Sequence, residues 1–538
     1  MNNLNFLVDV LKESPVFKTL EKNVKPGRTV CASGLSTINK SNIIYALCRL
    51  KGVTAFCLAS DEKEAQTLCN DLSCMGLRAY VYPVRDFNFL DFQSRSHEYE
   101  HARLKVLLKL LNHECDVAIA CVDAAAQLTV PRNVLEQSVI EFEEGKELSL
   151  EKATKALTLL GYERFDAVEG SGQFSLRGGI LDFFMPDSDY PVRCEFWGDE
   201  ITDLSYFDIE TQRRFKKADK ITLSPSTEIV IEDRAALADK IEHKAKLLRS
   251  KNSAKAKEKL FSEAELIRSG AMIANADKFI NQIYDKPESL FDYLDRNTLV
   301  FASEFTAIQE RGKSMDFISN ETLMQGFEDG TLCRGFDRFA LTFNECTEFL
   351  QSHGTIVLEN FVHGSMPIKL SEIISFSTKQ ISAWGGSYKQ LKEDVDGLFT
   401  PESKGVIFAG TERAAKNLCD TFNADGINAV YSEGADKISK GELLVMQGAL
   451  SAGFEYPSQK FFAITYSQVS YRPEKSKKKK KKTGQEIYSL SELAPGDYVV
   501  HNVHGIGVFG GIRKIDTHGV IKDYIKIDYA KGDVLYVP

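Results

Sequence analysis

The chain has 538 residues, a net charge of −9, 43% hydrophobic residues and 27% charged residues, which is typical of a globular protein too long for a single core. The sequence offers neither an apolar run long enough to cross a bilayer nor a basic amino terminus followed by an apolar stretch, so we expect a cytoplasmic protein without membrane contacts. Its 11 cysteines include no C-x-x-C pair, so we expect no metal site and mostly reduced cysteines in the core.

Successive parts of the sequence differ in their pattern of apolar, charged and glycine residues. Residues 28–130 alternate short apolar runs with helical patterns, which predicts a parallel sheet covered by helices. Between about 140 and 210, alternating strands broken by Gly-Gly and Gly-Asp turns predict an inserted, strand-rich module. A charged helical stretch at 234–283 precedes a buried strand in NTLVFASEF, and a further α/β unit follows at 370–468. Glycine-punctuated strands after 487 predict a small β-barrel.

These changes predict an α/β multidomain protein with six segments. They are the first half of a domain at 1–138, an insert at 139–224, the second half at 225–368, a small α/β domain at 369–470, a Lys-rich linker at 471–486 and a small β module at 487–538. The lysine run 475–482 favours an extended, solvated linker, with nonspecific DNA contact as the alternative.

The stretch GLSTINKS at 34–41 is similar to the phosphate-binding loop G-x-x-x-x-G-K-[ST]. Gly34, Lys40 and Ser41 stand at the expected offsets, but Asn39 replaces the second glycine, and its side chain would occupy space that phosphate oxygens need. In the later apolar strand 299–303, Ser303 followed by Glu304 stands where an acidic pair should bind Mg²⁺. We therefore predict a degenerate nucleotide site without catalytic residues; a working ATP site is the alternative.

Three stretches carry a family resemblance. GQFSLRGGILDFFMP…PVRCEFWGDEITDLSYFDIETQRR resembles the second domain shared by UvrB and the transcription-repair coupling factor (Mfd) family. SLFDYLDRNTLVFASE resembles the family's degraded motif II, and PGDYVVHNVHGIGVFGGI…KDYIKIDYAKGDVLYVP resembles its RNA-polymerase-interacting domain. Because UvrB has no such last module, the coupling factor family is the better match.

The resemblance implies a degenerate RecA-like domain split by the insert and an SH3/Tudor-like barrel at the end. It also implies a function in transcription-coupled nucleotide excision repair, with UvrA and the RNA polymerase β subunit as partners. The family's ATP- and Mg-dependent DNA translocase would follow this segment, so we expect an N-terminal fragment that needs no cofactor, is not an enzyme and contacts DNA weakly or through the missing motor. The alternatives are a UvrB-like ATP-dependent helicase and a plain DNA-binding protein, which fits poorly with the charge of −9.

The insert presents a candidate interface. In VRCEFW the apolar residues alternate with Arg193, Glu195 and Trp197, and in FSLR the same alternation turns Arg177 outward. An exposed tryptophan and two arginines match the composition of interface hot spots. The resemblance places Arg177, Arg193 and Trp197 at positions that contact UvrA, whereas the residues alone also allow a domain junction.

The last module presents a second candidate interface. Arg513, Lys514 and Ile515 follow a Gly-rich strand, and an edge strand there could add to a strand of another protein. The resemblance implies that the partner is the RNA polymerase β subunit and that Ile515 makes the central apolar contact. The alternative is that Ile515 belongs to the core of the module.

Overall fold

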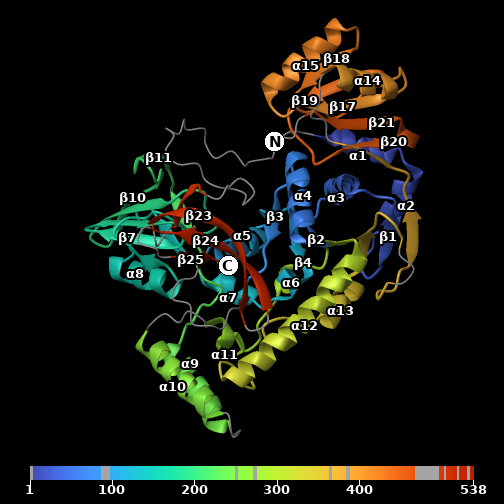
Figure 1. Cartoon of the computed structure of the whole chain (residues 1–538). Coiled ribbons are helices and arrows are strands. Elements are labelled where there is room, and N and C mark those ends of the chain that lie inside the picture. The colour runs from blue at the N-terminus through green and yellow to red at the C-terminus, as the bar shows by residue number, and fades with distance from the viewer. Residues whose placement is uncertain are drawn as a thin grey trace. The chain divides into compact units, whose positions relative to one another are not determined.

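The computed structural model describes residues 4–85, 97–248, 253–270, 276–362, 366–382, 388–466, 496–501, 505–517, 520–529 and 534–537 (Figure 1). The chain divides into two compact units, Met1–Tyr471 and Arg472–Pro538, and each is described by itself. The protein is a mixed α/β chain built on several sheets. Among the described residues, no helix has both the length and the apolar character needed to cross a membrane.

The centre of the first unit is a seven-stranded parallel sheet in the order β15-β1-β14-β13-β2-β4-β3, which confirms the predicted parallel sheet. Its strands are β1 Val30–Ser33, β2 Ala55–Ala59, β3 Ala79–Tyr82, β4 Val117–Cys121, β13 Leu299–Ser303, β14 Thr355–Leu358 and β15 Glu372–Ser375. The five inner strands are short, apolar and buried on both faces, as expected for a parallel sheet between helices, whereas the edge strand β15 is mostly exposed.

Two helical layers cover this sheet. One face packs against α1 Asn5–Lys12, α2 Pro15–Asn23, α3 Thr37–Lys51 and α4 Glu62–Cys74. The other face packs against α5 Glu98–Leu111, α6 Val122–Ala126, α7 Arg132–Gln137, α11 Ile280–Ile283, η2 Leu290–Tyr293, α12 Phe305–Asp329 and α13 Phe343–His353. Alternate residues of each strand enter the two cores, so both layers hold the same sheet.

A second sheet lies against the α1–α4 layer (Figure 1). Its order is β16-β20-β21-β17-β19-β18. The strands are β16 Lys379–Ile381, β17 Lys404–Phe408, β18 Ala429–Ser432, β19 Glu442–Met446, β20 Gly453–Tyr456 and β21 Phe461–Thr465; η3 Pro457–Gln459 joins the last two. Helices α14 Tyr388–Leu398 and α15 Glu412–Ala424 pack on its far face. The preceding strand β15 lies within the predicted 369–470 domain but pairs with β1 of the first sheet.

Polar contacts tie the second sheet to the helical layer. The carboxylate of buried Asp71 accepts hydrogen bonds from the Ser451 amide and hydroxyl, both at 2.7 Å. The hydroxyl of Tyr456 donates to Asn42 at 2.9 Å. These bonds satisfy polar groups inside a mostly apolar contact, so they help to fix how the two layers meet.

The inserted module has its own core. A six-stranded sheet in the order β11-β10-β9-β8-β7-β6 is covered on one face by α8 Leu150–Leu159. Its strands are β6 Glu163–Arg164, β7 Gln173–Arg177, β8 Ile180–Phe183, β9 Val192–Trp197, β10 Glu200–Phe207 and β11 Arg214–Lys217. At its base β5 Ile140–Glu143 pairs antiparallel with β12 Lys220–Leu223, so the chain enters and leaves the module side by side.

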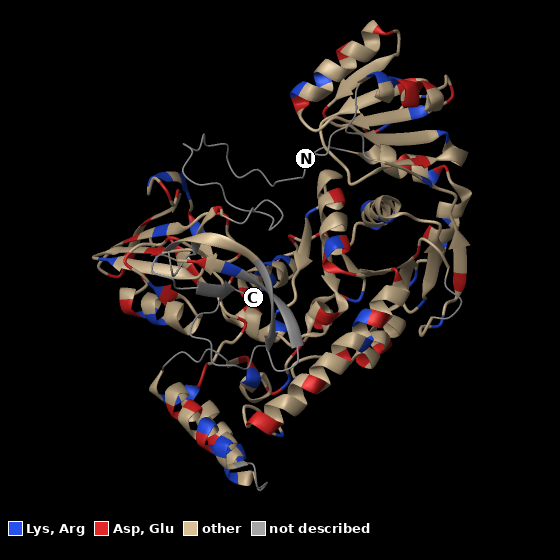
Figure 2. Cartoon of the chain, in the orientation of Figure 1, with Lys and Arg blue, Asp and Glu red and all other residues tan. Residues whose placement is uncertain are grey.

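The predicted helical stretch 234–283 contains two long helices and two short ones. They are α9 Arg234–Leu247, α10 Ser253–Ser269, η1 Ala276–Phe279 and α11. Helices α9 and α10 share a small apolar core with Phe279 and Phe336. Basic and acidic residues alternate along their other faces (Figure 2), so this pair has a solvated, mixed-charge surface.

The second unit is a four-stranded antiparallel sheet in the order β22-β23-β24-β25. Its strands are β22 Tyr498–His501, β23 Gly505–Thr517, β24 Val520–Asp528 and β25 Val534–Val537. Val499, Phe509 and Ile527 form its small described core. The predicted Lys-rich linker 471–486 lies outside the described residues.

Candidate functional site

The loop after β1 is shaped around the chain's own backbone. Strand β1 ends at Ser33, and α3 begins at Thr37, three residues before Lys40. Gly34 has φ +78°, and a Cβ added there would lie 2.2 Å from the carbonyl oxygen of Phe376. Only glycine fits a left-handed conformation under such a close approach, so the segment around Phe376 closes over the loop.

Two amides at the start of the loop already have acceptors in the chain. The Gly34 amide donates to the Asn360 carbonyl and the Leu35 amide to the Glu359 carbonyl, both at 3.1 Å. The Thr378 hydroxyl donates to the Gly34 carbonyl at 2.7 Å. A phosphate-binding loop works because its amides point at the ligand without other partners. Here the two residues after β14 provide the acceptors, and the segment after β15 donates a hydrogen bond to the loop.

Lys40 is buried in an ion cluster. Its ammonium donates to Glu304 at 2.5 Å, to Ser303 at 2.9 Å and to Glu64 at 3.4 Å, and the whole residue is 1% exposed. The cluster joins α3, α4 and the end of β13. The charge that would neutralise phosphates in a working site is therefore neutralised by carboxylates of the chain.

The remaining predicted loop residues serve local structure. Asn39 is fully buried and accepts a hydrogen bond from Ser36 at 2.6 Å. Ser41 is also fully buried and donates to the Asp71 carboxylate and to the Thr37 carbonyl, both at 3.3 Å. The structure thus brings Lys40 together with Ser303 and Glu304 as the sequence predicts, but it turns Asn39 and Ser41 to other partners.

Two carboxyls near Lys40 titrate in opposite directions. Burial favours the protonated form of Glu304, but Lys40 and further hydrogen bonds outweigh it and lower the pKa. Burial, together with the neighbouring Glu304 carboxylate, raises the pKa of Glu359 to about 7. Glu304 also has φ +56°, an uncommon conformation for a residue with a side chain. The site therefore combines a strained backbone position with two carboxyls whose pKa values are shifted in opposite directions by their surroundings.

The outer face of the insert sheet confirms the predicted alternation in β9. Val192, Cys194 and Phe196 are buried in the core, and Trp197 is 82% exposed. The prediction that Arg193 is exposed is wrong, because its side chain is only 13% exposed. The guanidinium lies 4.4 Å above the ring of Phe207, so Arg193 covers an apolar residue on this face.

Asp182 forms ion pairs with both Arg177 and Arg193. Its carboxylate is 1% exposed and accepts two hydrogen bonds from Arg193, both at 2.7 Å, and one from Arg177 at 2.8 Å. Arg193 also donates to the Gln212 side chain at 3.0 Å. Arg177 keeps about half of its side chain exposed, at 52%. Of the three predicted interface residues, Trp197 and Arg177 are therefore exposed, and Asp182 holds the third, Arg193, against the sheet.

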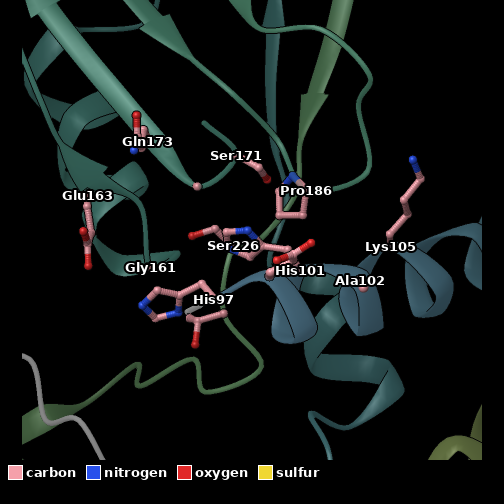
Figure 3. A pocket seen from close by; sticks show the side chains of 13 residues that line it. His97, His101, Ala102, Lys105, Gly161, Glu163, Ser171, Gln173, Pro186 and Ser226 are labelled. Carbon is pink, nitrogen blue, oxygen red and sulfur yellow. The ribbon is translucent and has the colours of Figure 1, made fainter. Parts of the chain in front are cut away.

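A cavity of about 460 Å³ lies between the start of α5 and the insert (Figure 3). His97 and His101 line it from successive turns, in the pattern H-E-x-x-H that also occurs in zinc proteases. His97 Nδ1 lies 3.0 Å from a Glu100 oxygen, and burial lowers the pKa of His101. The described residues contain no group of three or more metal-ligating side chains, so a zinc centre lacks its third ligand there.

Comparisons with known proteins agree with these modules. A family model described as the UvrB interaction domain matches residues 140–229, and one described as the CarD-like/TRCF RID domain matches residues 493–538. The transcription-repair-coupling factor of Bacillus subtilis is 28% identical over 98% of this chain and 46% of its own length. Those of Staphylococcus haemolyticus and Staphylococcus aureus are 26% and 23% identical over 85% and 99% of this chain.

The chain is similar to transcription-repair-coupling factors over nearly its whole length, and two domain models that fit such a protein match it in the same order. It spans about half the length of the curated relatives that it matches. The match to the UvrB interaction domain falls on the insert, and the match to the RID domain covers the described strands of the second unit.

The second matched domain contains Arg513, Lys514 and Ile515 in β23, where their backbones pair with residues 522–524 of β24. Their side chains lie outside the described residues. On its other side, β23 pairs with β22 only as far as Val508, and the last backbone bonds there join Phe509 to Gly496 and Asp497. In the described sheet, residues 510–517 therefore have a strand partner on one side only.

Proposed function

We propose that this chain is a recruitment scaffold of transcription-coupled nucleotide excision repair. In this proposal the insert binds UvrA and the second unit binds the β subunit of RNA polymerase. Support comes from the two matched domain models and from the names of the relatives. The family's ATP-dependent DNA translocase, which displaces stalled polymerase, would lie in the part of the relatives' length that this chain does not cover.

The loop after β1, residues 34–41, supports the proposal that this chain does not hydrolyse ATP; we call it the filled loop because contacts of the chain itself occupy it. Two of its amides donate to the residues after β14, and Lys40 is neutralised by Glu304 and Glu64. We infer that the seven-stranded sheet is a RecA-like domain whose nucleotide chemistry has been replaced by internal contacts. The alternative, a UvrB-like helicase with a working nucleotide site, would need these contacts to open before ATP could bind.

The outer face of the insert supports UvrA binding through Trp197 and Arg177. A largely exposed tryptophan is an anchor typical of interface hot spots. Arg177 can offer its free N–H groups to a partner carboxylate because Asp182 holds only one of its nitrogens. Arg193 contributes by supporting this surface, since Asp182, Gln212 and Phe207 already surround its guanidinium.

The free side of β23 supports polymerase binding by strand addition. Within the described sheet, residues 510–517 pair on one side only, so the other side can offer main-chain donors and acceptors to a strand of the β subunit. Ile515 would then supply the side chain that fixes the register, with Arg513 and Lys514 beside it. The four-stranded antiparallel order is compatible with an SH3/Tudor-like barrel.

Binding measurements on the whole chain test the proposal. We expect the purified chain to capture UvrA and the polymerase β subunit separately, and neither ATP nor Mg²⁺ to change either affinity. Trp197→Ala should reduce capture of UvrA alone, because the two sites lie in separate units. DNA-stimulated ATP hydrolysis that is lost on Lys40→Ala would instead establish the helicase alternative.

A further inference from the structure

A small cavity of about 230 Å³ lies at the amino-terminal ends of strands in the first sheet, whereas the filled loop lies at the carboxyl-terminal end of β1. Its walls come from the segment before β1 and from the first residues of β13 and β14. The filled loop follows the other end of β1. The cavity is thus a separate feature of the fold, outside both proposed protein-binding surfaces.

The lining of this cavity is basic. Lys25, Arg28, Lys51, Arg296 and His353 line it, and none of its lining residues is an aspartate or a glutamate. The whole chain contains 76 acidic and 67 basic residues, so a wall with only basic charges departs from the average surface. Such a wall creates a locally positive potential that attracts anions.

Part of this charge has no protein counterion. Arg28 pairs with Glu372 at 3.3 Å, and Lys51 reaches Glu21 at only 3.9 Å. Within the described part of the chain, neither Lys25 nor Arg296 has a carboxylate within 4.0 Å. Two exposed cations therefore face the cavity uncompensated.

Arg28 adds a second, independent observation. Its Nε atom is enclosed by the protein and has no hydrogen-bond acceptor among the residues that the structure describes. A buried donor without an acceptor costs free energy, and such groups normally have a partner, an ordered water or a bound ion. Because this atom has almost no accessible area, the Arg28 side chain must rotate before an anion in the cavity can accept from it.

We propose that this cavity binds a single phosphate group. Its volume of about 230 Å³ is below the roughly 300–1,000 Å³ of sites that enclose a whole small-molecule ligand. Tetrahedral oxyanions match the forked guanidinium donors of Arg28 and Arg296 and the point charge of Lys25. The phosphate belongs either to a free phosphate ion or to the backbone of DNA, and both present the same oxygens.

Helix dipoles offer a competing explanation. Helices α2, α3 and α13 all end near this cavity, and basic residues at helix carboxyl ends offset their partial negative charge. That explanation accounts for Lys51 and His353, which stand in last turns. It does not account for Arg296, which lies in the loop before β13, or for the orphan donor on Arg28.

The test compares two doubly substituted chains of equal charge. Lys25→Gln/Arg296→Gln removes the uncompensated cations, and Lys389→Gln/Arg413→Gln removes two exposed cations elsewhere. Calorimetric titration with inorganic phosphate is run at constant ionic strength, with chloride as the reference anion. Each cation about 4 Å from the anion contributes roughly fivefold in water, so the first variant should bind phosphate about 25-fold more weakly, while the control binds like the wild type.

Every outcome decides the proposal. Equal binding by both variants would overturn it as a general salt effect, and no binding by the wild type would overturn it directly. If the wild type binds as expected, a short duplex DNA is added as a competitor. Displacement of phosphate identifies a DNA backbone as the source, and a failure to displace it identifies a free phosphate ion. Equal melting temperatures without phosphate confirm that the variants fold.

Discussion

Replacing Lys40 by alanine distinguishes a structural role of this lysine from a catalytic role. In a working phosphate loop this lysine contacts the nucleotide, and its removal abolishes turnover with little effect on folding. In this chain the ammonium lies among Glu304, Ser303 and Glu64. Lys40→Ala therefore leaves two carboxylates without their counterion, and we expect the first unit to lose stability.

The size of the loss follows from burial. Removing one partner of a buried ion pair costs about 3–5 kcal/mol. The side chains of Lys40 and Glu64 are 2% and 10% exposed, but Glu304 is 26% exposed and keeps some hydration. We therefore expect about 3 kcal/mol, at the lower end of that range. For a cooperative unit of this size, such a loss lowers the melting temperature by roughly 3 °C.

Urea unfolding, calorimetry and ATP turnover are measured on the same preparations. Lys389→Ala removes an exposed lysine and serves as the control. Lys40→Met/Glu304→Gln removes both members of the closest pair and should recover part of the loss. The reasoning is refuted if Lys40→Ala keeps wild-type stability, and more strongly if the wild type hydrolyses ATP and this variant does not.

Three further predictions concern the remaining sites. Trp197→Ala should weaken UvrA binding, measured by calorimetry, by about 2 kcal/mol or more. The control is Phe317→Ala, which replaces an exposed aromatic residue on α12 and should not change binding. Equal losses in the two variants would show that Trp197 does not belong to the interface. The pKa of Glu359 is raised from 4.5 to about 7, so the contribution of this carboxyl to stability falls as pH rises through that window. The melting temperature of Glu359→Gln relative to wild type should therefore increase between about pH 5 and 8. A difference that does not change with pH would contradict the raised pKa of Glu359. Ile515→Arg should abolish capture of the polymerase β subunit while Lys514→Ala has a small effect; an unfolded second unit in the first variant would place Ile515 in the core.

Local patterns were enough to predict the elements, because they depend on neighbours in sequence. The parallel sheet followed from short apolar runs between helices, and the alternation in β9 followed from its period of two. The partners of charged side chains were not accessible in this way. Asp182 meets Arg193 through the register of β8 against β9, and nothing in VRCEFW alone says that the arginine is already bound.

The same limit applies to the loop after β1. The sequence shows that Asn39 and Ser303 are unsuited to nucleotide chemistry, but it does not show what replaces the nucleotide. Glu304 lies 264 positions from Lys40 along the chain, and the carbonyls of Glu359 and Asn360 come from just after another strand. The H-E-x-x-H pattern at His97–His101 was legible in the sequence, yet only the structure shows that the described residues supply no third ligand.

The contacts that fill the loop hold neighbouring strands and helices of the proposed scaffold together. In nucleotide-driven proteins, phosphate contacts order or release neighbouring segments, so binding and hydrolysis move the elements around them. Here Lys40 joins α3 and α4 to β13, and the Gly34 and Leu35 amides join β1 to the end of β14. These bonds are present without a ligand, so no exchange of nucleotide is needed to hold the strands together. The insert leaves this domain after α7 and returns before α9 through the β5–β12 pair, so its outer face is carried on a domain whose strands are joined by contacts of the chain itself. If the insert binds UvrA as proposed, its affinity should depend on access to Trp197 and on ionic strength, and not on ATP.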